Sequence, residues 1–322
     1  MLRKNLVAAL NLIILLFAGS RTTLGQASAK PRADEQSYTL KMPVDEVKVT
    51  FHVSDGSGNP LQHLNKSEID LFDNGKLQNR KLAFHEYSDL PIRVGFLLDN
   101  SPSMQTQLDR SQLIASQLIK EFFRPQSDSA FTMGFGVDSR VTQDWTRDSN
   151  SVSKGITAGL VKEPTQSDGT ALFDAVYKAC KDKFSTETAE LTGNFILLFT
   201  DGEDTSSRVW EGAAVDMCQR ARTAIYVFIP ESKTRVTPGQ QIVEDLVSKT
   251  GGRVFYQSRQ AMHDALASAV SDMRYQYELI YSPSGLKRDG TFHHIKMKCS
   301  ASHAQIQVRS GYYAYAKPRE SK

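Results

Sequence analysis

The spacing of hydrophobic residues along this chain changes twice. In residues 46–53 (EVKVTFHV) apolar and polar positions alternate with a period of two, and short runs of similar character follow at 69–76 and 81–87. A period of two is typical of strands that bury one face, and turn-forming residues separate the runs. The pattern predicts several antiparallel strands within residues 37–90.

From Pro91 onward, nearly continuous apolar runs alternate with stretches of helical periodicity. Strands without polar alternation are typical of a parallel sheet covered on both faces, and a βαβ series favours right-handed crossovers. We therefore predict a doubly wound, mostly parallel, Rossmann-like α/β domain over residues 91–273. The expected strands are 92–98, 130–137, 141–145 (an edge strand), 194–200, 224–229 and 253–256, and the expected helices are 108–122, 151–160, 171–183, 210–222, 241–249 and 260–273.

Alternating strands return in the C-terminal segment, residues 274–317. We expect them at 275–282, 292–300 and 305–316. This segment and the N-terminal β segment are either separate or paired. We favour pairing into one small β-sandwich, because about three strands on each side would have difficulty burying an apolar face alone.

The first 29 residues have the features of a secretory signal peptide. Arg3 and Lys4 precede an apolar run at residues 6–18, and Ala27-Ser28-Ala29 offers small residues for cleavage. The alternative is an uncleaved membrane anchor, but an apolar run of about 13 residues is short for a membrane span. We expect a flexible leader at residues 30–36, and a secreted, periplasmic or cell-envelope protein.

The net charge gives no reason to expect a nucleic-acid partner. The full chain has 39 basic and 36 acidic residues, which gives +3. Residues 1–25 contain three basic residues and no acid, so their removal leaves 36 of each sign and a net charge of zero. A nucleic-acid-binding surface would need a basic stripe, and none is visible in the sequence.

The three cysteines, Cys180, Cys218 and Cys299, have no C-x-x-C spacing and therefore indicate neither a zinc knuckle nor a redox motif. At most one disulfide can form among them. We favour Cys180 and Cys218 as unpaired, buried helix residues over a disulfide between them.

Oxygen-bearing side chains follow the first strand of the predicted α/β domain. Asp99, Ser101 and Ser103 form a D-x-S-x-S motif that can direct three oxygen ligands at one point. An ordinary polar turn or a helix N-cap is the alternative, because Asp, Asn, Ser and Pro are also common turn residues.

Two further loops favour a binding site. Thr170 begins a predicted helix within the sequence SDGT, and Asp201 follows another buried strand directly. Ligands of doubly wound sheets bind beyond the carboxyl ends of strands where the winding reverses, so Asp99 and Asp201 would open into one crevice if their strands are neighbours there. Carboxylates and hydroxyls without histidine or cysteine indicate a hard cation, Mg²⁺ or Mn²⁺, with Ca²⁺ as a further alternative.

These five residues resemble the metal-ion-dependent adhesion site (MIDAS) of von Willebrand factor A domains. The resemblance implies that Ser101, Ser103 and Thr170 bind the cation through hydroxyls. It also implies that Asp99 and Asp201 bind it directly or through water. One coordination position is then left for a carboxylate of a partner protein.

The resemblance extends over about residues 91–273. The flanking segments 58–76, 277–283 and 308–316 further resemble secreted VWFA-related proteins typical of acidobacteria. Glu203, Asp204 and Asp138 should lie on loops at the same sheet edge. We favour solvated loop charges over the alternative that these residues tune the site or repel acidic partners.

Three functions are consistent with the sequence. The favoured one is an exported, non-enzymatic, cation-dependent module that captures an Asp or Glu of a so far unidentified protein. The second is a Mg²⁺-dependent phosphate hydrolase with Asp99 as nucleophile, although dehalogenase-type phosphatases have a second Asp where this chain has Ser101. The third is a structural envelope protein in which the metal only rigidifies the loops. No G-x-S-x-G, H-E-x-x-H or P-loop motif is present.

Overall fold

The computed structural model describes residues 46–161, 168–185, 192–230, 237–257 and 262–314. The predicted signal peptide and leader lie outside these ranges. Within the ranges, no helix combines the length and hydrophobicity that a membrane span requires.

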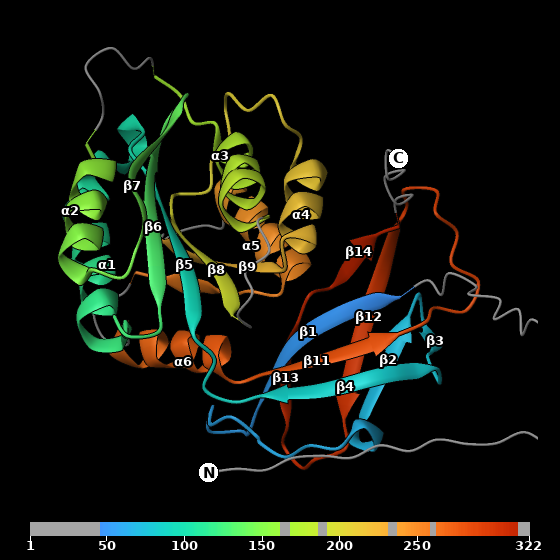
Figure 1. The fold of residues 1–322 in the computed structure, drawn as a ribbon. Coiled ribbons are helices and arrows are strands. Elements are labelled where there is room, and N and C mark those ends of the chain that lie inside the picture. The colour runs from blue at the N-terminus through green and yellow to red at the C-terminus, as the bar shows by residue number, and fades with distance from the viewer. Residues whose placement is uncertain (1–45, 162–167, 186–191, 231–236, 258–261, 315–322) are drawn as a thin grey trace, which may run out of the picture. The chain divides into compact units, whose positions relative to one another are not determined.

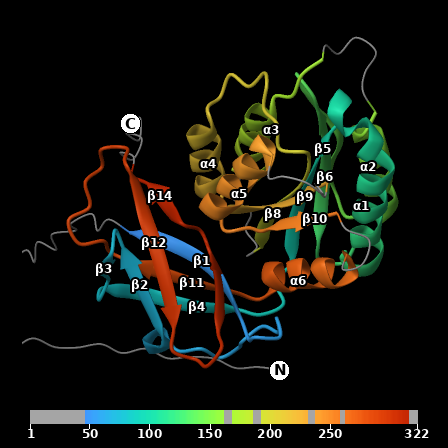
Figure 2. The same ribbon diagram turned by 180° about the vertical axis from the view of Figure 1, so that it is seen from behind.

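A six-stranded sheet forms the centre of the α/β part, with strand order β10-β9-β8-β5-β6-β7 (Figures 1 and 2). Five of its strands are parallel, and β7 pairs with β6 in antiparallel orientation. The predicted doubly wound, mostly parallel sheet is therefore confirmed. Its strands are β5 (Ile92–Asp99), β6 (Ser129–Phe135), β7 (Ser139–Thr146), β8 (Gly193–Phe199), β9 (Thr223–Ile229) and β10 (Val254–Tyr256).

Helices cover both faces of this sheet. Figures 1 and 2 show α1 and α2 on one side and α3, α4 and α5 on the other. Side chains of α6 join the apolar cluster on the side of α1 and α2. The helices are α1 (Leu108–Phe122), α2 (Ser149–Gly159), α3 (Leu172–Ala179), α4 (Glu211–Arg220), α5 (Pro238–Thr250) and α6 (Met262–Arg274).

The apolar runs of the central strands supply both of these clusters. In β5, Phe96 and Leu98 pack with α1 and α2, whereas Leu97 packs with α3 and α4. Successive side chains of a strand point to opposite faces, so a strand between two helical layers needs apolar residues at every position. This requirement explains why the sequence of β5 does not alternate.

The winding of the sheet reverses between β5 and β8. From β5 the chain continues to β6 and β7 on one side and then returns to β8 on the other side of β5. The register pairs Leu98 with Phe199, so both strands end at the same level. The structure thus confirms that the strands preceding Asp99 and Asp201 are neighbours at the switch point.

The remaining strands form two antiparallel four-stranded sheets, with orders β13-β1-β11-β4 and β14-β12-β2-β3. Each sheet combines strands from the N-terminal and C-terminal segments, and their inner faces share one apolar cluster. Apolar side chains of the two segments bury one another in this cluster, which gives both segments a core that neither could form alone. The strands are β1 (Val47–Ser54), β2 (Ile69–Asp73), β3 (Lys76–Leu77), β4 (Lys81–Tyr87), β11 (Gln276–Tyr281), β12 (Phe292–Cys299), β13 (Gln305–Val308) and β14 (Gly311–Tyr313).

One predicted strand, residues 305–316, is two strands in the structure. β13 pairs with β1, whereas β14 pairs with β12 of the other sheet. At the change between them, the Ser310 amide donates to the Ser248 carbonyl, outside both sheets. Alternation of apolar residues persists through such a crossing, so the sequence pattern alone did not reveal it.

The expectation for the cysteines was wrong, because Cys180 and Cys218 form a disulfide. Cys218 lies in α4, and Cys180 begins a short π-helical turn that continues α3 (residues 180–184). Both side chains are fully buried between these neighbouring helices, and their Cα atoms are 5.0 Å apart. Cys299 is a free thiol.

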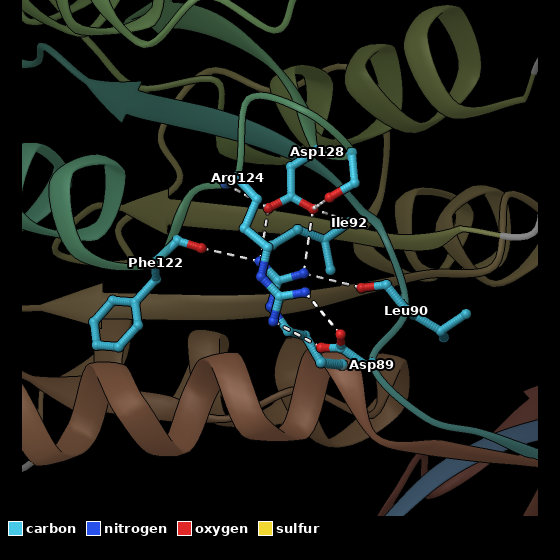
Figure 3. Close-up of polar contacts among 8 residues, drawn as sticks. Asp89, Leu90, Ile92, Phe122, Arg124 and Asp128 are labelled. Carbon is cyan, nitrogen blue, oxygen red and sulfur yellow. Dashed lines mark hydrogen bonds and ion pairs between the residues drawn. The ribbon is translucent and has the colours of Figure 1, made fainter.

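A buried ion pair holds together the two points where the chain passes between the sandwich strands and the α/β domain. We call residues 88–91 and 274–275 the neck. Arg274 donates from Nη2 to Asp128 Oδ2 (2.6 Å) and from Nη1 to the Leu90 carbonyl (3.0 Å). The Asp128 carboxylate also accepts from the amides of Ile92 and Arg124, at 3.0 and 2.8 Å (Figure 3). Arg274 and Asp128 are almost completely buried.

We expect Asp128→Ala to lower the free energy of unfolding by about 3–5 kcal/mol, because it leaves the buried Arg274 guanidinium without its counter-ion. Asp89→Asn is the matched control, because Asn tolerates the left-handed φ of +57° at this position. Asp89 forms a bidentate pair with Arg124 nearby, but both side chains are about half exposed, so the cost should stay below about 1 kcal/mol. Urea unfolding of both variants measures the difference, and equal costs would contradict the assigned role of Asp128.

We expect the disulfide to stabilise the fold by about 4 kcal/mol, because it closes a loop across 38 positions in the unfolded chain. Chemical unfolding of wild-type protein with and without reductant, and of Cys218→Ala, should show this loss. A thiol assay on the unfolded, unreduced chain should detect Cys299 alone. Reactivity of all three cysteines in that assay would rule the disulfide out.

Candidate metal centre

Three loops carry the five predicted ligands. The first loop (residues 99–103) begins at the last residue of β5, and the third loop (200–210) follows β8. The second loop (168–171) leads into α3, and its Ala171 amide donates to the carbonyl of Gly136, just beyond β6 (2.7 Å). Because β5, β6 and β8 are parallel neighbours, all three loops lie at the same edge of the sheet.

Asp99 forms the buried floor of the first loop and has no exposed surface. Its Oδ1 accepts from the Ser101 amide (2.9 Å), and its Oδ2 accepts from the Thr200 hydroxyl (2.6 Å). The Ser101 and Ser103 hydroxyl oxygens are 3.2 Å apart. The structure therefore brings the three oxygen-bearing side chains of the D-x-S-x-S motif together, with Ser101 buried and Ser103 exposed.

Asn100 attaches the first loop to its surroundings. Its amide donates to the Phe135 carbonyl at the end of β6 (2.8 Å), and its side-chain nitrogen donates to the Gly159 carbonyl at the end of α2 (3.3 Å). These contacts fix the position of the loop from two neighbouring elements.

Thr170 is held by the third loop through its backbone. The Thr170 amide donates to Thr205 Oγ1 (2.9 Å), and the Thr170 carbonyl accepts from the amides of Thr205 and Ser206 (2.8 and 2.9 Å). Gly169 permits this close approach, because a Cβ on it would lie 2.5 Å from Ser206 Oγ and its φ of +138° disfavours other residues. The second and third loops are thus in direct contact.

Asp201 lies at the start of the third loop and is half-buried. Its Oδ1 accepts from the Glu203 amide (3.1 Å). Thr200, which sequence reasoning missed, connects the first and third loops, because its hydroxyl donates to Asp99 and accepts from the Gly202 amide (3.0 Å). The sequence could have suggested a role for Thr200, because this residue lies between the end of a buried strand and the predicted ligand Asp201.

Burial raises the pKa of Asp99 to about 6, although hydrogen bonds from Ser101 and Thr200 favour its charged form. The nearby charge of Asp201 adds to the increase. Two neighbouring carboxylates would gain from a bound cation, and the hydroxyls beside them are hard ligands as well. The donor set therefore fits a hard divalent cation.

Clusters of ionisable ligands do not offer another site in the part of the chain that the structure describes. No group of three or more His, Cys, Asp or Glu residues there is arranged to hold a metal ion. The candidate site of the three loops instead combines two carboxylates with hydroxyl oxygens.

The expectation of solvated loop charges was wrong for Asp204. Its Oδ1 accepts from the Leu172 amide at the start of α3 (2.8 Å) and from the Ser207 hydroxyl (2.5 Å). Asp138 and Glu203 are exposed, as expected. The hydrogen bonds of Asp204 could not be predicted from the local sequence, because Leu172 lies 32 positions away along the chain.

Comparison with protein families gives a match to the von Willebrand factor type A domain over residues 94–264. No curated protein matches the chain. The matched region contains all three loops.

Solved structures similar to this chain include an aerotolerance-related membrane protein from Bacteroides fragilis (18% identity, 56% of this chain and 98% of that chain, TM-score 0.46). The conserved hypothetical protein BatB from Bacteroides thetaiotaomicron is 19% identical (55% and 96%, TM-score 0.43). Proximal thread matrix protein 1 from the mussel byssus, in a structure with a zinc-occupied MIDAS motif, is 12% identical (61% and 48%, TM-score 0.45).

We expect the Asp99 carboxyl of metal-free protein to titrate near pH 6. Its folded pKa is above the usual 3.8, so this group's stabilisation is complete below about pH 4 and is lost as pH rises through about 6. Carboxyl ¹³C NMR in chelator measures the titration. Asp148, whose pKa is lowered chiefly by its hydrogen bonds with Ser151, is the internal control. Titration of Asp99 below pH 4 would contradict the burial argument.

Proposed function

Because the chain belongs to the von Willebrand factor type A domain family, we propose that it is a non-enzymatic, divalent-cation-dependent binding module that captures an acidic residue of a partner protein. Family membership agrees with the resemblance inferred from the sequence. The observation that carries the proposal is the position of Asp99. This buried carboxylate has a raised pKa and lies among hydroxyls at the switch point of the sheet.

The proposed ligands are the hydroxyls of Ser101, Ser103 and Thr170 and the carboxylates of Asp99 and Asp201. Mg²⁺ suits these oxygens, with Mn²⁺ and Ca²⁺ as alternatives. A bound cation would supply a Lewis-acidic position for a carboxylate of the partner.

The burial of these residues supports a division of roles. Asp99 is buried and accepts hydrogen bonds at both carboxylate oxygens, so it is fixed in place and unavailable to a partner. Ser103 is exposed and Asp201 is half-buried. The partner's carboxylate would therefore approach from the side of Ser103 and Asp201.

The burial of Asp99 also favours binding over phosphate hydrolysis. A nucleophilic carboxylate must reach the phosphorus atom of its substrate, but the Asp99 side chain has no exposed surface. The position two residues further is Ser101, which cannot replace a second Asp as general acid.

We further propose that the protein is exported and acts in the secreted, periplasmic or cell-envelope space. The disulfide between Cys180 and Cys218 supports this location, because disulfides persist mainly in oxidising compartments. The proposed partner is a protein with an accessible Asp or Glu, and the balanced charge gives no support to a nucleic-acid partner.

We expect about 1 mM Mg²⁺ to stabilise the wild-type protein by about 1.4 kcal/mol if the dissociation constant is about 0.1 mM. Asp99→Ala should abolish this gain, since it removes a buried ligand. Asp289→Ala, in an exposed turn between β11 and β12, is the control and should retain it. Calorimetric titration with Mg²⁺ measures the affinity directly, and equal Mg²⁺ binding by Asp99→Ala would refute the ligand assignment.

Capture of a partner separates binding from a purely structural role for the metal. Immobilised protein should retain a partner from envelope or extracellular fractions in Mg²⁺ and release it in chelator, and Asp99→Ala should retain none. Retention that persists in chelator would count against the proposal. Cation binding without a Mg²⁺-dependent partner would favour the structural role, and Asp99-dependent hydrolysis of a phosphate ester would favour the enzyme.

A further inference from the structure

Two carboxylates connect the third loop with the start of α3 in opposite directions. Asp204, in the third loop, accepts at Oδ1 from the amides of Leu172 (2.8 Å) and Phe173 (3.4 Å) in the first turn of α3. The first amides of a helix have no partner within the helix, so an acceptor from outside satisfies them and also interacts favourably with the helix dipole.

Asp174 makes the reverse connection. It lies in the first turn of α3, and its Oδ1 accepts from the amides of Val209 (2.7 Å) and Arg208 (3.0 Å) in the third loop. Ser207 joins the two carboxylates, because its hydroxyl donates to Asp204 Oδ1 (2.5 Å) and accepts from the Asp174 amide (3.1 Å). We call Asp174, Asp204 and Ser207 the carboxylate clamp.

The clamp lies beside Thr170. One residue, Ala171, separates Thr170 from α3. The Thr170 amide donates to the Thr205 hydroxyl, and the Thr170 carbonyl accepts from the amides of Thr205 and Ser206, which follow Asp204 directly. The third loop carries Asp201 at its other end. One short segment of chain therefore connects the position of Thr170 to that of Asp201.

We propose that Asp204 and Asp174 are positioning residues of the cation site, which fix the Thr170 hydroxyl relative to the Asp201 carboxylate before a cation binds. This inference rests on the proposed function, because it assigns both Thr170 and Asp201 as ligands. Neither clamp carboxylate is among the proposed ligands. Their contribution is to order the second and third loops in advance, so that the cost of ordering does not reduce the affinity for the cation.

The chain supplies a matched control in Asp148, the N-cap of α2. Asp148 accepts from the amides of Asn150 and Ser151 and from the Ser151 hydroxyl, all within its own helix. It lies at the opposite end of α2 from Gly159, whose carbonyl accepts from Asn100 of the first loop. Asp148→Ala therefore removes a helix-capping carboxylate of the same domain without releasing a site loop.

The experiment measures the affinity of Mn²⁺ alone, by electron paramagnetic resonance and calorimetry, at a temperature where every variant is folded. We expect Asp204→Ala to weaken Mn²⁺ binding by about 10- to 100-fold. Asp204→Asn keeps an oxygen that accepts from the Leu172 amide and should remain near the wild-type affinity. Asp148→Ala should lower the melting temperature and leave the affinity unchanged.

Hydrogen exchange gives a second measurement that does not depend on the metal. In chelator, the Thr205 and Ser206 amides should exchange faster in Asp204→Ala than in wild-type protein, because the third loop is released from α3. Asp148→Ala should leave their exchange unchanged. If Asp204→Ala does not fold, Ser207→Ala removes the shared hydroxyl and should weaken Mn²⁺ binding in the same direction.

The possible failures are distinguishable. Wild-type protein that binds no Mn²⁺ would overturn the proposed function, and the positioning role with it. Wild-type protein that binds Mn²⁺ with the same affinity as Asp204→Ala would overturn only the positioning role. Equal losses of affinity in Asp204→Ala and Asp148→Ala would also overturn it, by showing a general effect of stability.

Discussion

The parallel pairing of β5 with β8 is the constraint on which the candidate site depends. The register that places Leu98 beside Phe199 also places Asp99 beside Thr200, and the hydrogen bond between these side chains connects two loops. A shift of one residue in either strand would turn the corresponding side chains to the opposite face. The side chains on both faces of the two strands are closely packed against the helices, and a shift would disrupt that packing, so the core fixes the geometry of the polar loops.

Two buried carboxylates mark opposite ends of β5 and illustrate two ways to stabilise a charge away from water. Asp128 accepts from the Ile92 amide at the start of the strand and is neutralised by Arg274. Asp99 ends the strand, and its described contacts are hydrogen bonds from Ser101 and Thr200. Hydrogen bonds offset only part of the desolvation, and the raised pKa of Asp99 reflects this deficit. Asp128 is paired with a cationic side chain of the protein itself, Arg274. Among the described residues, Asp99 has hydrogen bonds alone and is suited to a cation from solution.

Much of the fold could be predicted from the sequence because its signals are local. The periodicity of residues 108–122 gave the bounds of α1, and the apolar runs gave the central strands to within a few residues. The D-x-S-x-S motif, Thr170 and Asp201 could be identified because each lies directly beyond a strand or before a helix. The structure places these residues on loops at one edge of the sheet.

The features that sequence reasoning missed depend on contacts between distant segments. Cys180 and Cys218 are 38 positions apart, and only the packing of α3 against α4 makes their pairing evident. From the sequence alone, Asp204 resembles an ordinary solvated loop charge. Its hydrogen bond from the Leu172 amide is evident only when the third loop and the start of α3 are seen side by side. The division of residues 305–316 between two sheets likewise depends on which strands are available on each side.

The neck has a consequence for the order of folding. β4 and β11 pair directly, yet the chain between them contains the whole α/β domain, and Leu90 and Arg274 are 184 positions apart. Closing so long a loop in an unfolded chain costs conformational entropy before any strand contact forms. In a folded α/β domain, Arg274 and Asp128 hold the two ends of the domain close together. β4 and β11 are then as near to each other as two strands joined by a short turn. On this argument we expect the α/β domain to fold before β4, an edge strand of its sheet, pairs with β11.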